Sequence, residues 1–373
     1  MQDGTKRGVD GMNAVELSPL WQLAGLGALI ASGPLLWLRV RKRAATPQAR
    51  LRALTVLTLF LTFDLVLFGA FTRLTDSGLG CPDWPGCYAN ASPLGAHADI
   101  SVAQAALPGG PVTHGKAWIE MIHRYLASSV GVMILVLCVW SWRQARAVVS
   151  PWWPTVTLVW VCIQGAFGAL TVTMKLFPAI VTLHLLGGIG LLMLLAVQAQ
   201  GYAPRPLILR PPLRRAAWVL LGLAVVQVAL GGWVSTNYAV LACAEFPTCQ
   251  GGQWWPPMDF AQGFTVWRGL GESAQGAWLP FAALTAIHIA HRLGAAVVFC
   301  ALLLFCWRLW GEGSDARRWA QWLLLLVLWQ FFSGLSNVVL DWPIVAALAH
   351  TGGAAVLLTL LSVLLARLHQ ART

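Results

Sequence analysis

Four histidines are the side chains whose type and spacing best fit a chemical role. His123 and His291 lie near the starts of two apolar segments, and an arginine directly follows each. His184 and His350 lie early in two further apolar segments, with a pair of glycines shortly after each. A pair of imidazoles on facing helices is what an axially ligated haem iron needs. The pattern therefore predicts two haem-binding sites, one for each pair of histidines.

Two other interpretations of these histidines are open. A lone histidine in an apolar segment is more often a hydrogen-bonded packing residue, but four at matching positions are harder to explain in that way. Zinc is disfavoured because no carboxylate or cysteine completes a tetrahedral set beside them. A further histidine, His288, lies one turn before His291 and is an alternative ligand. The match between the two His-Arg pairs favours His291.

One acidic residue distinguishes the two copies of this pattern. Glu120 lies three positions before His123 and so on the same helix face, whereas the second copy has His288 at the corresponding position. An acid beside a bound macrocycle is suited to proton transfer. The alternatives are that Glu120 only orients His123 or pairs with Arg124.

Two arginines follow the candidate ligands directly. Arg124 and Arg292 could pair with haem propionates, because the guanidinium fork matches a carboxylate. The alternative is that they extend to lipid phosphates. Asp64 lies deep in another apolar segment and has no acidic counterpart in the second copy. Proton relay and pairing with a nearby polar group are both open for it.

Two pairs of cysteines share one spacing. Cys81 and Cys87 form the first pair, and Cys243 and Cys249 form the second. If their loops face an oxidising compartment, short-range disulfides are expected, and the spacing is unlike that of zinc or iron-sulfur sites. Whether such bonds only hold the loops or also pass electrons is left open.

The composition fixes the class of protein that must position these residues. Of 373 residues, 58% are hydrophobic and 10% are charged, which predicts an all-α polytopic membrane protein. A nucleic-acid partner is therefore a poor explanation of the net charge of +11. Nine apolar segments are long enough to span a bilayer: 18–39, 52–71, 118–141, 152–174, 178–200, 215–236, 280–307, 319–340 and 343–367.

The basic residues predict the orientation. Most of the 25 lysines and arginines fall in alternate connections, which the positive-inside rule places in the cytoplasm. The loops 72–117 and 237–279, which carry the cysteine pairs, are then outside, with the N-terminus outside and the C-terminus cytoplasmic. The first apolar segment is expected to be a retained anchor helix, because its basic cluster follows it, whereas a cleaved signal peptide carries its charge in front.

The eight later segments form two copies of four. The cysteine pairs, the histidines and the Gly-containing stretches recur in the same order in both copies, which is the signature of an internal repeat. An even number of helices per copy predicts a parallel repeat of two four-helix bundles, related by a pseudo-twofold axis along the membrane normal. The expected divisions are 1–50 for the extra helix and its basic linker, 51–205 for the first half and 206–373 for the second half.

The stretch Thr72 to Cys87, TRLTDSGLGCPDWPGC, carries a specific resemblance. Together with the run EMIHR at 120–124 and the duplicated histidines, it resembles the heme A synthase family over about residues 52–368. The resemblance implies oxidation of the C8 methyl of haem O to the formyl group of haem A, in a bacterial-type inner membrane. The extra N-terminal helix departs from the eight-helix pattern of that family.

The resemblance also implies a division of roles between the halves. The second half would keep a haem b between His291 and His350, and the first half would hold the substrate haem O with Glu120, His123 and His184 as the catalytic set. A haem O synthase is then the expected source of the substrate, while the electron acceptor is open.

Two other functional classes compete with this prediction. The main alternative is a di-haem b-type membrane cytochrome that transfers electrons from quinol without carbon chemistry. A transporter built on the parallel repeat is a further class, but the Gly/Pro-broken helices with mid-membrane charges that mark it are weak here.

Overall fold

The protein is an all-helical bundle in the computed structural model, which describes residues 18–371 except 145, 147–149 and 274. The predicted external N-terminus lies outside the described residues. The helices are α1 (Ser18–Arg41), α2 (Pro47–Leu74), α3 (His97–Ala106), α4 (His114–Gln144), α5 (Trp152–Thr173), α6 (Pro178–Gly201), α7 (Pro211–Thr236), α8 (Phe260–Gly263), α9 (Phe281–Trp310), α10 (Ser314–Val339) and α11 (Ile344–Gln370).

The predicted membrane spans are confirmed. Within the described ranges, 9 helices are long and apolar enough to cross a membrane, and these are all the helices except α3 and α8. Several begin where the sequence signals a start: α2, α6 and α7 open with proline at the first helical position. Proline is favoured there because that position has no intrahelical partner for an N–H group. The helix ends therefore follow local sequence.

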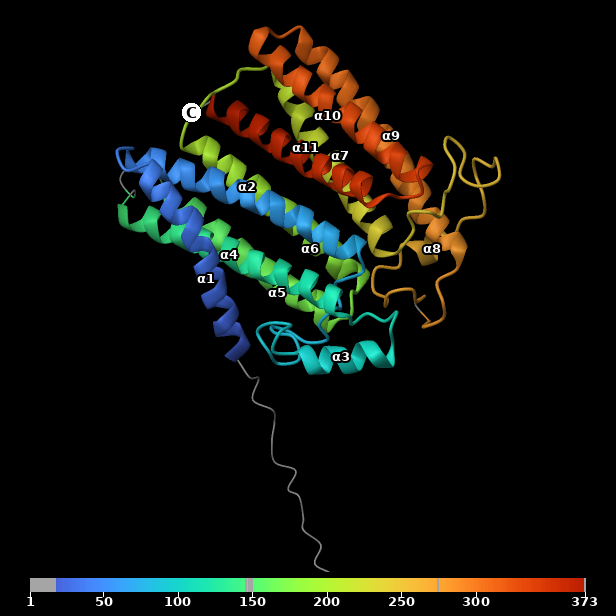
Figure 1. The fold of residues 1–373 in the computed structure, drawn as a ribbon. Coiled ribbons are helices and arrows are strands. Elements are labelled where there is room, and N and C mark those ends of the chain that lie inside the picture. Colours follow the sequence, from blue (N-terminus) through green and yellow to red (C-terminus); the bar gives the residue numbers. More distant parts are fainter. Residues whose placement is uncertain (1–17, 145, 147–149, 274, 372–373) are drawn as a thin grey trace, which may run out of the picture.

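The spanning helices of the two halves form two groups of four. In the first group α2 contacts α4 and α6, and α5 contacts the same two helices. In the second group α7 contacts α9 and α11, and α10 contacts the same two. Figure 1 shows the first group in blue and green and the second in yellow to red, side by side. Each group thus closes a ring around its own interior.

The contacts between the groups are those that a twofold relation would produce. Helix α6 meets α11, while α2 meets α11 and α6 meets α7. In a twofold relation α2 corresponds to α7 and α6 corresponds to α11. The contact of α2 with α11 then corresponds to that of α7 with α6, and the contact of α6 with α11 corresponds to itself. The predicted pseudo-twofold axis itself stays a prediction.

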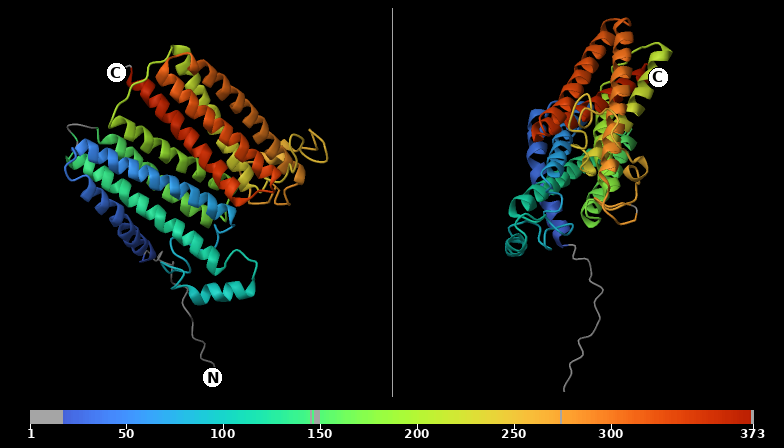
Figure 2. Two further views of the ribbon diagram at one scale, coloured as in Figure 1. Left: turned by 45° about the horizontal axis from the view of Figure 1, so that its top comes forward. Right: turned by 90° about the vertical axis from the view of Figure 1, so that its right-hand side faces the viewer.

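The extra helix α1 packs along the outside of the first group, against α4 (Figure 2). The two helices approach closely at Gly27, where an added Cβ would lie 2.7 Å from the Cβ of Ser128. Small residues permit such close helix packing. One turn before Gly27, α1 places Leu23 in one buried cluster with Cys81 and Cys87. The extra helix therefore supports both α4 and the first cysteine loop.

Both cysteine loops lie at the same end of the bundle, and the C-terminus lies at the other end (Figures 1 and 2). Each loop contains a short helix that the sequence did not predict, α3 in the first and α8 in the second. The loop end of the bundle is also where the candidate site residues lie.

Candidate functional site

Each of the four predicted histidines lies against a glycine of a neighbouring helix. A Cβ placed on Gly69 would lie 3.0 Å from Cε1 of His123, and one on Gly168 would lie 3.5 Å from Cε1 of His184. The corresponding distances are 3.1 Å for Gly231 and His291 and 3.0 Å for Gly334 and His350. A side chain at Gly69, Gly231 or Gly334 would crowd the imidazole beside it, whereas a Cβ at Gly168 would only reach ordinary van der Waals contact. Three of the four ring positions therefore depend on a glycine.

The histidines of the second half face each other. The rings of His291 and His350 have centroids 6.5 Å apart and planes inclined by 86°. An imidazole nitrogen binds a transition metal at about 2 Å, so this separation accommodates one metal ion between the rings. His288 points elsewhere, which is the arrangement that the match between the His-Arg pairs predicted. In the first half His123 lies on α4 and His184 on α6, the helices that match α9 and α11.

The Nδ1 atoms of both histidines have polar neighbours in the second half. Ser333 lies with Oγ 3.0 Å from Nδ1 of His350, and its hydroxyl donates to the carbonyl of Trp329 at 2.6 Å. The hydroxyl is thus free to accept from an N–H at Nδ1, which leaves Nε2 available as a ligand. The side-chain amide of Gln227 lies 3.0 Å from Nδ1 of His291 and donates to the carbonyl of the same histidine.

The first half does not offer these partners. Among the described residues, Nδ1 of His123 and Nδ1 of His184 are buried without a hydrogen bond. When the glycines of the two halves are matched, the position of Gln227 is taken by Leu65 and that of Ser333 by Phe167. Both replacements are apolar, so the rings of the first half are held by packing alone. The halves therefore differ in how firmly they orient their histidines.

Glu120 lies under the first cysteine loop. Its side chain is 4% exposed, one carboxylate oxygen accepts from the N–H of Cys81 at 2.8 Å, and the other pairs with Arg124. The guanidinium of Arg124 also donates to the carbonyls of Asp83 and Pro85. The pairing of Glu120 with Arg124, which the sequence left open as an alternative role, is therefore present, and both residues hold the loop.

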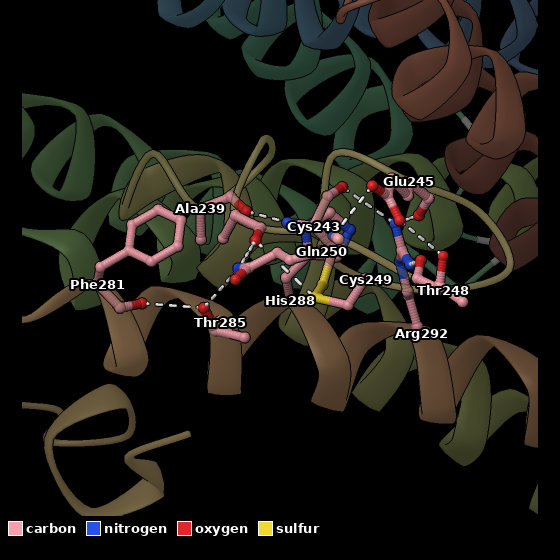
Figure 3. Close-up of a disulfide and its surroundings, with 12 residues drawn as sticks. Ala239, Cys243, Glu245, Thr248, Cys249, Gln250, Phe281, Thr285, His288 and Arg292 are labelled. Carbon is pink, nitrogen blue, oxygen red and sulfur yellow. Dashed lines mark hydrogen bonds between the residues drawn. A yellow bond between two sulfur atoms is a disulfide. The ribbon is translucent and has the colours of Figure 1, made fainter. Parts of the chain in front are cut away.

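The second half repeats this arrangement with a histidine in place of the acid (Figure 3). The N–H of Cys243 donates to Nδ1 of His288 at 3.3 Å, as that of Cys81 does to the acid. Arg292 donates to the carbonyls of Cys243, Glu245 and Thr248. Because Arg124 and Arg292 both donate to their loops in this way, their pairing with propionates stays a prediction.

The predicted disulfides are present. Cys81 is bonded to Cys87, and Cys243 is bonded to Cys249. A carboxylate two residues after the first cysteine of each pair accepts from two consecutive backbone N–H groups beyond the second cysteine. In the first loop Asp83 performs this role. The two loops thus share one hydrogen-bonding plan.

In the second loop that carboxylate belongs to Glu245. It accepts from Gly251 at 3.0 Å and from Gly252 at 2.9 Å, two residues with positive φ. The N–H of Gly252 and the hydroxyl of Thr248 hold the pKa of the Glu245 carboxyl below its usual value of 4.5.

This lowered pKa predicts a pH dependence of the loop. A carboxyl with a lowered folded pKa stabilises the fold above its unfolded pKa, and this contribution is lost as the pH falls through the folded pKa. Amide exchange of Gly251 and Gly252 should therefore lose protection, relative to intrinsic rates, below about pH 4. Glu245→Gln should show weakened protection at every pH. Protection in Glu245→Gln that falls with pH as in the wild type would contradict this assignment.

Arg73 joins the two halves, which the sequence did not reveal. It donates to the carbonyl of Ser235 at the end of α7, and its guanidinium lies 4.0 Å from the ring centre of Tyr238. It also pairs with Asp76 at 3.1 Å, and Asp76 accepts from the Tyr238 hydroxyl. Part of the TRLTD stretch therefore serves contact between halves.

The donor set fits axial haem ligation better than a multidentate metal site. Within the described residues, no three His, Cys, Asp or Glu side chains come together as a metal-binding group. What the helices do bring together is one histidine pair in each half, each ring seated on a glycine. Two imidazoles can ligate a haem iron, and glycines beside them leave room for the flat macrocycle because they have no side chain.

Comparison with known proteins agrees with this site. A family model described as cytochrome oxidase assembly protein matches residues 52–362, which begins after α1. The heme A synthase of Shewanella oneidensis is 39% identical over 306 residues, covering 81% of this chain and 92% of the relative. The heme A synthase of Mesorhizobium japonicum is 28% identical over 356 residues, covering 89% of this chain and 93% of the relative. The chain therefore belongs to the heme A synthase family of cytochrome oxidase assembly proteins.

Proposed function

We propose that this protein oxidises the C8 methyl group of haem O to the formyl group of haem A within the membrane. The observation that carries the proposal is the pair of histidines in each half, accompanied by a buried acid in only one half. Family membership supports the same reaction, because relatives of this chain are named heme A synthases. A di-haem cytochrome would need the histidines but gives no role to an acid in one half alone.

The halves have different roles in this proposal. His291 and His350 hold a resident haem b, and His123 and His184 hold the substrate haem O. Hydrogen bonds to the outer nitrogen of a ligating histidine fix its ring and raise its basicity, which suits a permanent ligand. Ser333 is such a partner, because its hydroxyl can accept from Nδ1–H of His350, whereas the amide nitrogen of Gln227 is a donor and only positions His291 through its carbonyl. A substrate must enter and leave, and the unpartnered rings of the first half suit exchange.

Glu120 is the proposed proton acceptor. Oxidation of a methyl carbon to an aldehyde with water as the oxygen source releases four protons and four electrons over two rounds, and a positioned carboxylate lowers the barrier to proton removal. The carboxylate is held by Cys81 and Arg124, one helical turn from His123. When bound, haem supplies one-electron chemistry at its iron. The electrons leave to a membrane acceptor, and a haem O synthase supplies the substrate through the bilayer.

The proposed orientation places the cysteine loops outside and the C-terminus in the cytoplasm of a bacterial inner membrane. The basic connections at the end of the bundle away from the loops support it. Haem O and the histidine pairs then meet near the outer surface.

The reaction is tested by expressing the chain with a haem O synthase in a bacterium that makes no haem A. Extracted haems are separated by chromatography and identified by pyridine haemochrome spectra. Appearance of formyl haem supports the proposal. Abundant protein that carries haem b and yields no haem A would support the di-haem cytochrome instead.

The glycine seats predict a sharp effect of one methyl group. Gly231→Ala would place a Cβ 3.1 Å from Cε1 of His291. The imidazole ring would then have to move by a few tenths of an ångström, away from its position as a ligand. Overpacking of this kind should weaken haem b retention about tenfold. Gly222→Ala on the same helix is the matched control, because nothing lies within 4 Å of its added Cβ. If absorbance shows equal haem b content per protein in both variants, Gly231 does not control the position of the His291 ring.

The hydrogen bond from His350 to Ser333 predicts a change in redox potential. Ser333→Ala should raise the midpoint potential of haem b, because a less basic ligand stabilises the oxidised iron less, and should weaken haem retention by about 10-fold or more. Ser336→Ala is the control, since its hydroxyl donates to the Ser333 carbonyl instead. Phe167→Ser should conversely slow the release of haem from the first half. If a redox titration gives Ser333→Ala and Ser336→Ala the same midpoint potential of haem b, the hydrogen bond from His350 to Ser333 does not tune the haem.

A further inference from the structure

A basic groove lies at the end of the bundle away from the cysteine loops. It has a volume of 460 Å³ and lies between the connection before α7, the first turns of α10 and the last turns of α11. Three arginines line it, Arg205, Arg318 and Arg367, against one acid, Asp315. The charge of its lining is therefore strongly positive, and none of the catalytic or haem-ligating candidates takes part in it.

The groove is held in place by hydrogen bonds between its walls. The N–H of Leu207 donates to the carbonyl of Arg367 at 3.2 Å, and the N–H of Arg205 donates to the side chain of Gln370 at 3.2 Å. These bonds fix the connection that carries Arg205 against the end of α11. The fold thus fixes the backbone of Arg205 beside that of Arg367.

Within the described part of the chain, Nε of Arg367 is buried without a hydrogen-bond acceptor. The guanidinium of Arg367 lies 5.2 Å from the ring centre of Trp319. A buried guanidinium N–H without an acceptor is costly. An anion in the groove would provide that acceptor, and a phosphate matches the guanidinium fork.

The other walls of the groove are apolar and lie deeper in the bundle. Val363 and Leu360 lie about one and two turns before Arg367 on α11, and Trp322 lies one turn after Arg318 on α10. Trp322 is 60% exposed, as expected for a ring at the membrane interface. The groove is therefore polar at the helix ends and apolar towards the bilayer core, which matches an amphiphile.

We propose that this groove binds the phosphate head group of an anionic phospholipid. The guanidiniums of Arg205, Arg318 and Arg367 bind the phosphate, and one acyl chain lies along Trp322, Leu360 and Val363. Basic pockets between spanning helices are typical sites for such lipids. The apolar floor distinguishes a lipid from a free phosphate ion, which would use only the polar end.

The test uses the full-length protein, delipidated in an uncharged detergent and titrated with phosphatidylglycerol in native mass spectrometry. Retained phosphatidylglycerol is expected, with binding at least about fivefold weaker in Arg367→Gln and in Arg318→Gln. Arg318 is 77% exposed, so its substitution leaves packing unchanged. Arg317→Gln is the matched control, because Arg317 lies outside the groove, 5.8 Å from the Trp310 ring.

Three results would overturn the proposal. The first is equal retention of phosphatidylcholine, which would remove the preference for an anionic lipid. The second is complete displacement of the lipid by millimolar inorganic phosphate, which would make the groove a site for a free anion. The third is an equal loss in Arg317→Gln and Arg318→Gln, which would assign the effect to surface charge in general.

Discussion

Glu120→Ala should lower haem A formation by about 100-fold or more, while haem b stays bound in the second half. The reason is that general acid-base groups contribute a factor of this size, and no acid occupies the matching place in the second half. The measurement is the ratio of haem A to haem O extracted from membranes that contain equal amounts of each protein.

Glu120 also holds the loop through Cys81, so a second variant separates the two roles. Glu120→Gln keeps an oxygen that can accept from the Cys81 N–H but no longer accepts a proton. It should be as inactive as Glu120→Ala, with amide exchange in the loop close to that of the wild type. Wild-type haem A production by Glu120→Gln would leave only the loop-holding role for this residue.

His350→Ala should remove the resident haem b. It deletes one of two facing rings, so the loss of affinity should exceed the 10–100-fold that removal of a ligand's hydrogen-bond partner typically costs. The low-spin b-type absorption of the purified protein should fall accordingly, while haem O still binds the first half. His369→Ala, an exposed histidine at the end of the same helix, is the control. Unchanged low-spin absorption in His350→Ala would exclude His350 as a ligand.

His291→Ala and His288→Ala extend this test to the facing helix. The structure places His291 opposite His350 and engages His288 with the loop through Cys243. His291→Ala should therefore lose haem b, and His288→Ala should chiefly loosen the loop. The reverse result would make His288 the ligand.

The helices and the disulfides were predictable from sequence because their signals are local. Apolar length located the spans, and the equal spacing of the cysteines in two long loops anticipated both bonds. The short helices α3 and α8 were missed because they lie in long loops without a clear periodic pattern.

Contacts between helices were much less predictable. Gly69 and Gly231 were visible as repeated residues, but their position against the histidine rings depends on how the helices cross. The partners of Nδ1, Ser333 and Gln227, lie on other helices than their histidines, so no spacing within one segment indicates them. Matching the two halves position by position could have flagged both, because apolar residues replace them in the first half.

The role of the arginines shows the same limit. Arg124 follows a histidine in sequence, but its guanidinium turns to the carbonyls of the cysteine loop. A loop that folds back over a helix end supplies acceptors that sequence alone does not place. The sequence predicted propionates or lipid phosphates as partners of the two arginines, which stays a prediction, and it did not indicate the loop carbonyls that they contact.

The division of roles between the halves is tested most directly by the haem content of a variant that lacks both histidines of the first half. His123→Ala combined with His184→Ala should purify with about one haem b per chain and with neither haem O nor haem A. Loss of haem b from this variant, or retention of haem O in it, would contradict the assignment of the resident haem to His291 and His350.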